Sequence, residues 1–178
     1  RDIQDRVEPE GPPLWASQVR EMLGQFRQEM MAVETGVGLA APQVNFSIRL
    51  FVVDGAPFAD EDPGLKEFKR VFINPVMLDE SGNLWKFNEG CLSIPGIRDD
   101  VNRHDTVFIR YHDENFKEQT GTFSGIAARI IQHEYDHLEG ILFTDRLSPL
   151  KKQLIKGKLN DISKGKVDVD YKMKFFSK

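Results

Sequence analysis

The stretch from residue 124 to residue 140 limits the possible folds most, because its hydrophobic period differs from that of the runs before it. Four residues fall at i, i+4, i+7 and i+11, which is the spacing of one helix face: Ile126, Ile130, His133 and His137. Ser124 is a typical N-cap, and Gly140 is a typical residue at which a helix ends. The spacing therefore predicts a helix over 124–139 with two histidines on its inward face.

Strand-like runs precede this helix. They are residues 48–53, 71–78, 85–87, 106–111 and 116–123. Turn-forming residues at 79–82 and 112–115 predict two hairpins, and the Pro-, Gly- and acid-rich segment 54–70 predicts a surface loop. Strands in series followed by a late helix favour an α+β fold, in which antiparallel strands and hairpins pack around that helix, over a chain of βαβ repeats.

Both ends of the chain carry further periodic segments. Apolar residues between Trp15 and Met30 predict an amphipathic N-terminal helix that ends near Gly36. After Ser148-Pro149, the spacing of Leu150, Leu154 and Leu159 predicts a second, C-terminal helix. The tail over 167–175 alternates at period two and predicts a half-buried strand.

Length and composition restrict the class of protein. The chain has 178 residues, of which 40% are hydrophobic, and this is enough for one domain over 1–178 with its own core. One cysteine excludes an intrachain disulfide and favours a reducing compartment. The longest apolar runs are far shorter than the ~20 residues that a membrane helix needs, and no secretory signal is visible, so we expect a soluble protein with no membrane partner.

The charges are unevenly distributed. Residues 148–178 hold nine Lys and three Asp, a balance of +6, so the net charge of −4 leaves −10 on residues 1–147. We therefore divide the chain into an acidic body, 1–147, and a variable basic tail, 148–178. A basic arm can bind an acidic surface such as nucleic acid.

The most specific motif is the H-E-x-x-H of residues 133–137. Histidines at i and i+4 on a helix can bind one metal ion, while the adjacent Glu134 can reach the metal-bound water. A catalytic site also needs a third ligand. The zinc-peptidase pattern would place a third His at 143, but Phe143 stands there, and no Glu follows Glu139. Cys91 is the best remaining ligand, which gives a Cys/His/His site suited to zinc or ferrous iron.

Several alternatives stay open at this point. The motif is also compatible with a zinc endopeptidase, with a metal-stabilised binding domain that has no catalytic activity, and with Cys91 acting as a nucleophile beside a histidine base. His104 and His112 could complete a closed structural zinc site with the motif histidines.

Three motifs taken together resemble the peptide deformylases. Residues 36–43 (GVGLAAPQ) match G-x-G-x-A-A-x-Q, residues 89–93 (EGCLS) match E-G-C-x-S, and residues 132–137 (QHEYDH) match Q-H-E-x-D-H, in the family's order. The resemblance covers roughly residues 30–147. It implies that Cys91, His133 and His137 bind one divalent metal ion, ferrous iron in the native enzyme, with zinc, nickel or cobalt as substitutes.

The resemblance also implies the reaction, which is removal of formate from the N-formylmethionine of newly made polypeptides. A metal-bound water has its pKa lowered toward neutrality and can act as the nucleophile. Glu134 would accept its proton and pass it to the leaving amine. In the family, the Gln43 amide and the Leu92 backbone N–H stabilise the developing oxyanion.

Substrate-binding residues are carried over on the same basis. The backbone of Val37 and Gly38 would pair with an extended peptide, and Val37, Ile126 and Ile130 would line the methionine pocket. The remaining positions are Gly90 and Arg98 in the peptide groove, and Glu89 with Arg103 as an ion pair that supports the Cys91 loop.

The expected partners are N-formylmethionyl nascent peptides and, through the basic tail, the ribosome, without sequence-specific binding of nucleic acid. Such docking would weaken steeply with salt. We expect a bacterial cytoplasmic enzyme. An organelle also fits, because the chain begins without Met and its start is expected to be trimmed.

Overall fold

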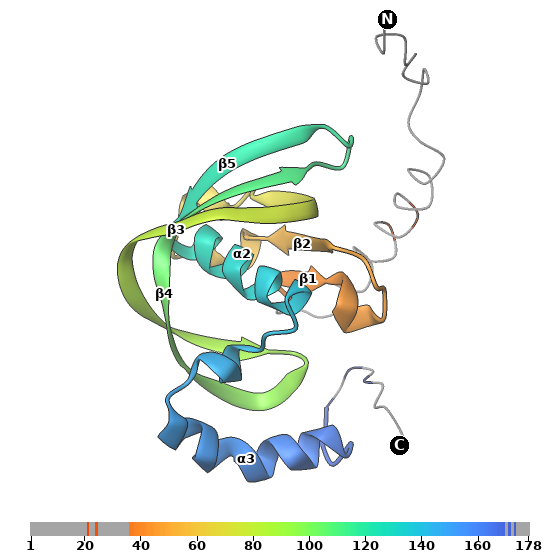
Figure 1. Ribbon diagram of the computed structural model, residues 1–178, viewed down its shortest axis with the longest axis vertical. Coiled ribbons are helices and arrows are strands. Elements are labelled where there is room, and N and C mark those ends of the chain that lie inside the picture. The colour runs from red at the N-terminus through yellow and green to blue at the C-terminus, as the bar shows by residue number, and fades with distance from the viewer. Residues whose placement is uncertain (1–20, 22–23, 25–35, 170, 172, 174–178) are drawn as a thin grey trace, which may run out of the picture.

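The computed structural model describes residues 21, 24, 36–169, 171 and 173 (Figure 1). The helix predicted over 15–30 lies outside the described residues, except for Glu21 and Gly24, which are helical and exposed. Within the described part, no helix is long and apolar enough to cross a membrane.

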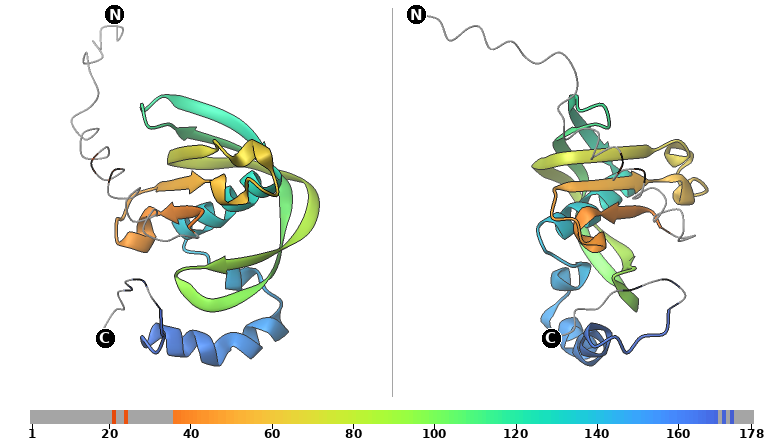
Figure 2. Two further views of the ribbon diagram at one scale, coloured as in Figure 1. Left: turned by 180° about the vertical axis from the view of Figure 1, so that it is seen from behind. Right: turned by 90° about the vertical axis from the view of Figure 1, so that its right-hand side faces the viewer.

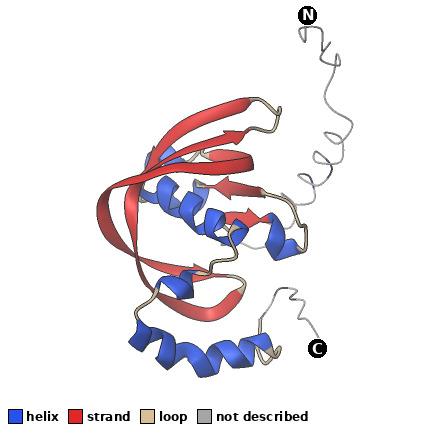
Figure 3. Cartoon of the chain, viewed as in Figure 1, coloured by secondary structure: helices blue, strands red, loops and turns tan. Residues whose placement is uncertain are grey.

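The architecture is the predicted α+β fold, with a five-stranded antiparallel sheet in the order β1-β2-β3-β4-β5 (Figure 3). The strands are β1 (Gly38–Ala40), β2 (Leu50–Asp54), β3 (Lys69–Cys91), β4 (Ile94–His112) and β5 (Glu118–Ser124). The helices are α2 (Gly125–Leu138) and α3 (Pro149–Ser163), and four short 3-10 turns complete the set: η1 (Ala41–Val44), η2 (Ala56–Phe58), η3 (Pro63–Leu65) and η4 (Phe143–Arg146). The predicted surface loop over 54–70 thus contains η2 and η3.

The hairpin predicted at 79–82 is wrong, because β3 continues through it and joins the two runs predicted as separate strands. The Gly-containing segment forms a β-bulge: Ser81 pairs with Thr106 and Leu84 with His104, so β3 has one extra residue. Gly82 has a φ of +79°, which is the left-handed conformation typical of such a bulge. Bulges bend and twist a strand pair, and β3 and β4 curve away from the sheet to end beside η4 and α3 (Figures 1 and 2).

The turn that does reverse β3 was not predicted. Leu92 and Ser93 are its two residues, and Cys91 pairs with Ile94 on either side of it. The second predicted hairpin is confirmed, since Asp113 accepts hydrogen bonds from the backbone of Asn115 and Lys117 between β4 and β5. Strand β5 starts at Glu118 rather than at residue 116, because Phe116 has a φ of 60°.

Helix α2 confirms the predicted helix and lies across one face of the sheet (Figure 1). Its buried apolar residues pack on the sheet in the main hydrophobic cluster, which includes Phe51, Phe72, Val107, Ile109, Ala128, Ile130 and Ile131. Ser124 occupies the N-cap position, although its side chain caps no backbone N–H. Gly140, with a φ of +70°, follows the end of the helix as expected. The inward face of α2 therefore carries both apolar residues and the motif histidines.

The C-terminal helix is confirmed as α3, but its predicted apolar face is partly wrong. Leu150 and Leu154 are 71% and 75% exposed, whereas Ile155, Leu159 and Ile162 pack against the β3–β4 hairpin. The described part of the strand predicted over 167–175, namely residues 167–169, 171 and 173, forms no strand, and the rest of that range lies outside the described residues. Burial alternates along this segment as predicted, since Val167 and Val169 are half-buried and Asp168 is exposed. No strand of the sheet pairs with these residues in the described part.

Candidate metal centre

The structure brings the end of β3 against the second half of α2, and three possible metal ligands meet there. Their ligand atoms, on Cys91, His133 and His137, all lie within 4.8 Å of one another. Cys91 Sγ is 3.3 Å from His137 Nε2. The two histidines lie one helical turn apart, with ring centroids 5.1 Å apart. Residues 46 positions apart in the sequence thus converge on one point.

The donor set fits a divalent transition metal, because one thiolate and two imidazoles suit zinc or ferrous iron. Burial raises the pKa of the Cys91 thiol, but hydrogen bonding to His133 and His137 outweighs burial and lowers the pKa overall. The thiolate is the form that ligates metal. Among the described residues this is the cluster with metal-binding geometry; His104 lies elsewhere, with its Nδ1 3.2 Å from the Gly82 carbonyl oxygen.

Glu89 orients His133. Its Oε2 lies 3.0 Å from His133 Nδ1, which leaves Nε2 for the ligand cluster. Burial alone would raise the pKa of Glu89, but His133 and Arg103 hold it well below its usual range. The pKa of His133 is raised despite burial, because Cys91 and Glu89 favour its protonated form. Glu89 therefore stays ionised and keeps the His133 ring in one orientation.

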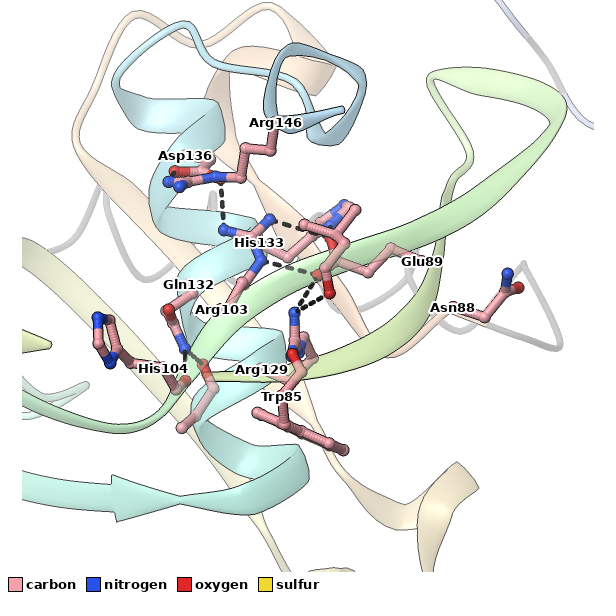
Figure 4. A network of polar contacts seen from close by, with 12 residues as sticks. Trp85, Asn88, Glu89, Arg103, His104, Arg129, Gln132, His133, Asp136 and Arg146 are labelled. Atoms are coloured by element: carbon pink, nitrogen blue, oxygen red, sulfur yellow. Dashed lines mark hydrogen bonds and ion pairs between the residues drawn. The ribbon is translucent and has the colours of Figure 1, made fainter. Parts of the chain in front are cut away.

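A buried network of charges surrounds Glu89 (Figure 4). Arg103 bridges two acids, donating to Glu89 Oε1 at 2.7 Å and Oε2 at 2.9 Å, and to Asp136 Oδ2 at 2.6 Å. Arg129 donates to Glu89 Oε1 at 2.9 Å, and Arg146 pairs with Asp136. The Arg103 side chain is 0% exposed, so the pair expected between Glu89 and Arg103 is present and buried. Buried charges need such partners.

Arg129, Asp136 and Arg146 were not singled out from the sequence. The available signal was that Arg129 and Asp136 are charged residues inside a helix predicted to be buried. Arg129 also donates to the backbone oxygens of Trp85 and Val101, and its guanidinium lies over the Trp85 ring. These contacts tie α2 to both strands of the hairpin that carries Cys91.

Glu134 lies beside the ligands and is 3% exposed. Its Oε2 is buried and has no hydrogen-bond partner among the described residues. Burial raises the pKa of this carboxyl group to about 7. Gly38 makes room for it, because a Cβ at residue 38 would lie 2.4 Å from Glu134 Oε1. The carboxylate is thus held in a slot that requires glycine opposite.

Gln43 faces the ligands from η1, which follows β1. Its Oε1 accepts a hydrogen bond from the Ala40 backbone at 2.7 Å, and this fixes which end of the amide points toward the cluster. Its Nε2 donates to Ser93 Oγ at 3.0 Å and lies 3.8 Å from Cys91 Sγ. A polarised N–H group therefore stands next to the Cys/His/His cluster.

Comparison with known proteins agrees with this arrangement. The family model described as polypeptide deformylase matches residues 6–153. The chain belongs to the peptide deformylase family. It is 58% identical over 147 residues to a peptide deformylase of Christiangramia forsetii, covering 79% of this chain and 75% of that protein. It is 53% identical over 157 residues to one of Flavobacterium psychrophilum, covering 84% and 81%.

Solved deformylase structures share the fold. An inhibitor complex of peptide deformylase 1B from Arabidopsis thaliana superposes with a TM-score of 0.75 and 32% identity, over 93% of this chain and 90% of that one. A peptide deformylase from Synechococcus elongatus in complex with actinonin gives a TM-score of 0.68 and 39% identity, over 79% and 72%. Membership in the peptide deformylase family supports metal-dependent deformylation of N-formylmethionine peptides as the activity. It does not favour the zinc endopeptidase or the non-catalytic binding domain.

Beside the deformylase motifs lies a cavity of about 160 Å³. The residues expected to bind substrate all line it: Val37, Gly38, Gly90, Arg98, Ile126 and Ile130. Phe58 and Phe87, which were not expected, line it too, in edge-to-face contact with centroids 6.1 Å apart. The Arg98 guanidinium is held by Asn88. It donates hydrogen bonds of 2.9 Å to the Oδ1 atom and to the backbone oxygen of that residue. The cavity is mostly apolar, and Cys91, His133 and Glu134 also line it.

Phe143 occupies the position where the zinc-peptidase pattern has its third histidine. Its side chain is 1% exposed, and its ring stacks on that of His133 with centroids 6.3 Å apart. In this deformylase-family chain residue 143 therefore packs against the candidate ligand His133, while the third candidate ligand, Cys91, lies at the end of β3.

Proposed function

We propose that Cys91, His133 and His137 hold one divalent metal ion, and that this site removes the formyl group from N-formylmethionyl peptides. The observation that carries the proposal is the convergence of these three ligands beside the buried, unpartnered carboxylate of Glu134. The bound ion would supply Lewis-acid chemistry to a water molecule and to the formyl oxygen.

Glu134 would carry the proton. Its Oε2 is buried beside the ligands and has no hydrogen-bond partner in the described part of the chain, so it can accept a proton from the attacking water. The same group can pass that proton to the amine as formate leaves. A general base placed in this way typically contributes about 10² to 10⁴ in rate.

Two N–H groups would stabilise the negative charge that develops on the formyl oxygen. Gln43 presents its Nε2 from one side, with its amide orientation fixed by Ala40. The backbone N–H of Leu92, in the turn that follows Cys91, would be the second donor. Losing one donor of this type typically costs about 3 to 4 kcal/mol of barrier.

The peptide would bind as an extra strand. Among the described strands β1 pairs only with β2, so its other edge, at Val37 and Gly38, can accept an extended peptide. The methionine side chain would enter the cavity lined by Ile126, Ile130 and Phe87. An unbranched thioether suits an apolar cavity of this kind.

We infer that the native ion is ferrous iron and that zinc, nickel or cobalt can replace it. One thiolate and two imidazoles accept all of these ions, so availability and oxidation decide which one is bound. Metal analysis of protein purified without oxygen and without added metal tests this. Zinc at full occupancy with no iron would contradict it.

The activity test uses protein loaded with ferrous iron under anaerobic conditions. Formyl-Met-Ala-Ser should release formate, whereas an unformylated longer peptide should stay intact. Cys91→Ser should lower metal affinity, and Glu134→Ala should keep the metal but lose turnover. Absence of formate release from the wild type would refute the function, and a fully active Glu134→Ala would refute the role of that residue.

We also propose that the part of the chain after residue 147 docks the catalytic body on the ribosome in the cytoplasm. Lys152 and Lys156 on α3, and Lys164 directly after it, are exposed and form no ion pair with other described residues. Replacing all three with Gln should weaken co-sedimentation with ribosomes at low salt. The matched control replaces three exposed lysines of the body, namely Lys66, Lys86 and Lys117. Equal binding by both triple variants would contradict the docking role.

A further inference from the structure

The two-residue turn after Cys91 has little support from its own hairpin. Cys91 pairs with Ile94, but the next pair on that side is Gly90 with Arg98, so three residues of β4 bulge out beside the turn. Gly96, in this bulge, has a φ of +68°. A bulge interrupts the ladder of hydrogen bonds locally. Contacts from elsewhere must therefore hold Leu92 and Ser93 in place.

One such contact comes from the active-site face, where Gln43 Nε2 donates to Ser93 Oγ at 3.0 Å. A second comes from the C-terminal tail, where the hydroxyl group of Tyr171 donates to the carbonyl oxygen of Leu92 at 2.7 Å. The two residues of the turn are thus each fixed by a side chain from a different part of the chain.

Tyr171 and the turn both line one groove. This groove of about 870 Å³ lies beside the turn, and Leu92, Gly96, Lys158, Val167 and Tyr171 are among the residues that line it. Val167, which follows α3, packs on the cluster of Ile94, Ile97 and Ile162. The hydrogen bond from Tyr171 therefore joins the turn to a segment that follows α3.

We propose that Tyr171 is a positioning residue for deformylation, which holds the Leu92 backbone so that its N–H faces the reacting formyl group. The inference rests on the function proposed above. The N–H and carbonyl groups of Leu92 flank the same Cα, so a fixed carbonyl restricts the dihedral angles that aim the N–H. Preorganised donors stabilise a transition state without reorganising during the reaction.

The expected effect is modest and falls on turnover. A typical hydrogen bond contributes about 1 kcal/mol net, which corresponds to about fivefold. Because the Leu92 N–H would act mainly in the transition state, kcat should fall and KM should not change. A purely structural contact would instead lower the unfolding temperature without separating kcat from KM.

The test compares Tyr171→Phe with the wild type as full-length, metal-loaded enzymes. Formyl-Met-Ala-Ser provides kcat and KM, and hydrogen–deuterium exchange provides a readout that does not depend on activity. Tyr111→Phe is the matched control, since it removes the same hydroxyl group from a buried residue of β4. Metal content and unfolding temperature are measured for all three proteins.

We expect Tyr171→Phe to lower kcat about fivefold with KM within twofold, and to speed exchange of the Leu92 and Ser93 amides by a similar factor. Tyr111→Phe should change neither. Wild-type kcat and exchange in Tyr171→Phe, or equal losses in both variants, would overturn the proposal. A wild type that releases no formate would refute the function, while the exchange measurement would still report whether Tyr171 holds the turn.

Discussion

Gly38 offers a sharp test of the catalytic arrangement. Its φ is not in the left-handed region, so alanine fits the backbone there, and any effect of Gly38→Ala must come from the added methyl group. That methyl group would lie 2.4 Å from Glu134 Oε1, 2.6 Å from Cδ and 2.7 Å from Cγ. Real Cβ atoms do not approach other atoms so closely, so the carboxylate must leave its slot.

The magnitude follows from what the carboxylate does. Overpacking of a close site costs typically about 1 to 3 kcal/mol of stability, which leaves the protein folded. Displacing a general base costs about 10² to 10⁴ in rate. We therefore expect kcat for formyl-Met-Ala-Ser to fall by at least about 100-fold, while bound metal stays at the wild-type level because the clash involves no ligand atom.

The assay measures formate release, metal content and urea unfolding on the same preparations. Gly157→Ala is the matched control, because a Cβ at this exposed position of α3 meets nothing within 4 Å. It should keep full activity and gain about 0.5 to 1 kcal/mol of stability from higher helix propensity. If Gly38→Ala retained activity within threefold of the wild type, the role given to Glu134 and its slot would be refuted.

Three further outcomes are expected. Arg103→Met leaves Glu89 and Asp136 with one fewer buried cation, and urea denaturation should show a loss of about 3 kcal/mol; a loss below 1 kcal/mol would mean that the remaining arginines replace it. Ile162→Ala should cost about 2 kcal/mol, and Leu154→Ala less than about 0.5 kcal/mol, because the first side chain is 7% and the second 75% exposed; similar costs in thermal melts would contradict the observed face of α3. Removing metal with a chelator should abolish formate release and lower the unfolding temperature, with both restored by ferrous iron; activity that survives complete removal would exclude a metal-dependent mechanism.

Local patterns allowed prediction of the elements whose burial they determine. Helix α2 repeats Ile126, Ile130, His133 and His137 along one face, so its period and its histidines were visible in the sequence. Helix α3 offers two rows of apolar residues, one through Leu150 and Leu154 and another through Ile155 and Ile162. Only packing against the hairpin selects the second row, and no local signal contains that information.

The error at 79–82 has a similar origin. Acidic residues, serine and Gly82 form reverse turns, but a Gly at positive φ also forms a β-bulge, and the two have the same local composition. The distinction depends on whether the partner strand continues on the other side, as β4 does.

The charge network could be predicted only in part. Glu89 and Arg103 came from resemblance to a family. Arg129 and Asp136 have partners 40 and 33 residues away in the sequence, which periodicity cannot detect. Tyr171 was visible only as one member of an alternating tail, because its contact with Leu92 spans 79 residues.

The β3–β4 hairpin also has a consequence for the order of folding. Its strands pair from Gly90 and Arg98 outward to Ile73 and His112, so once the first of these pairs has formed, each further pair closes only a slightly longer loop. Cys91 lies at the turn end of this hairpin. The histidines of α2 come later in the sequence, after β5. During synthesis from the N-terminus, Cys91 and both strands of its hairpin therefore leave the ribosome before His133 and His137, and docking of α2 brings the three candidate ligands together.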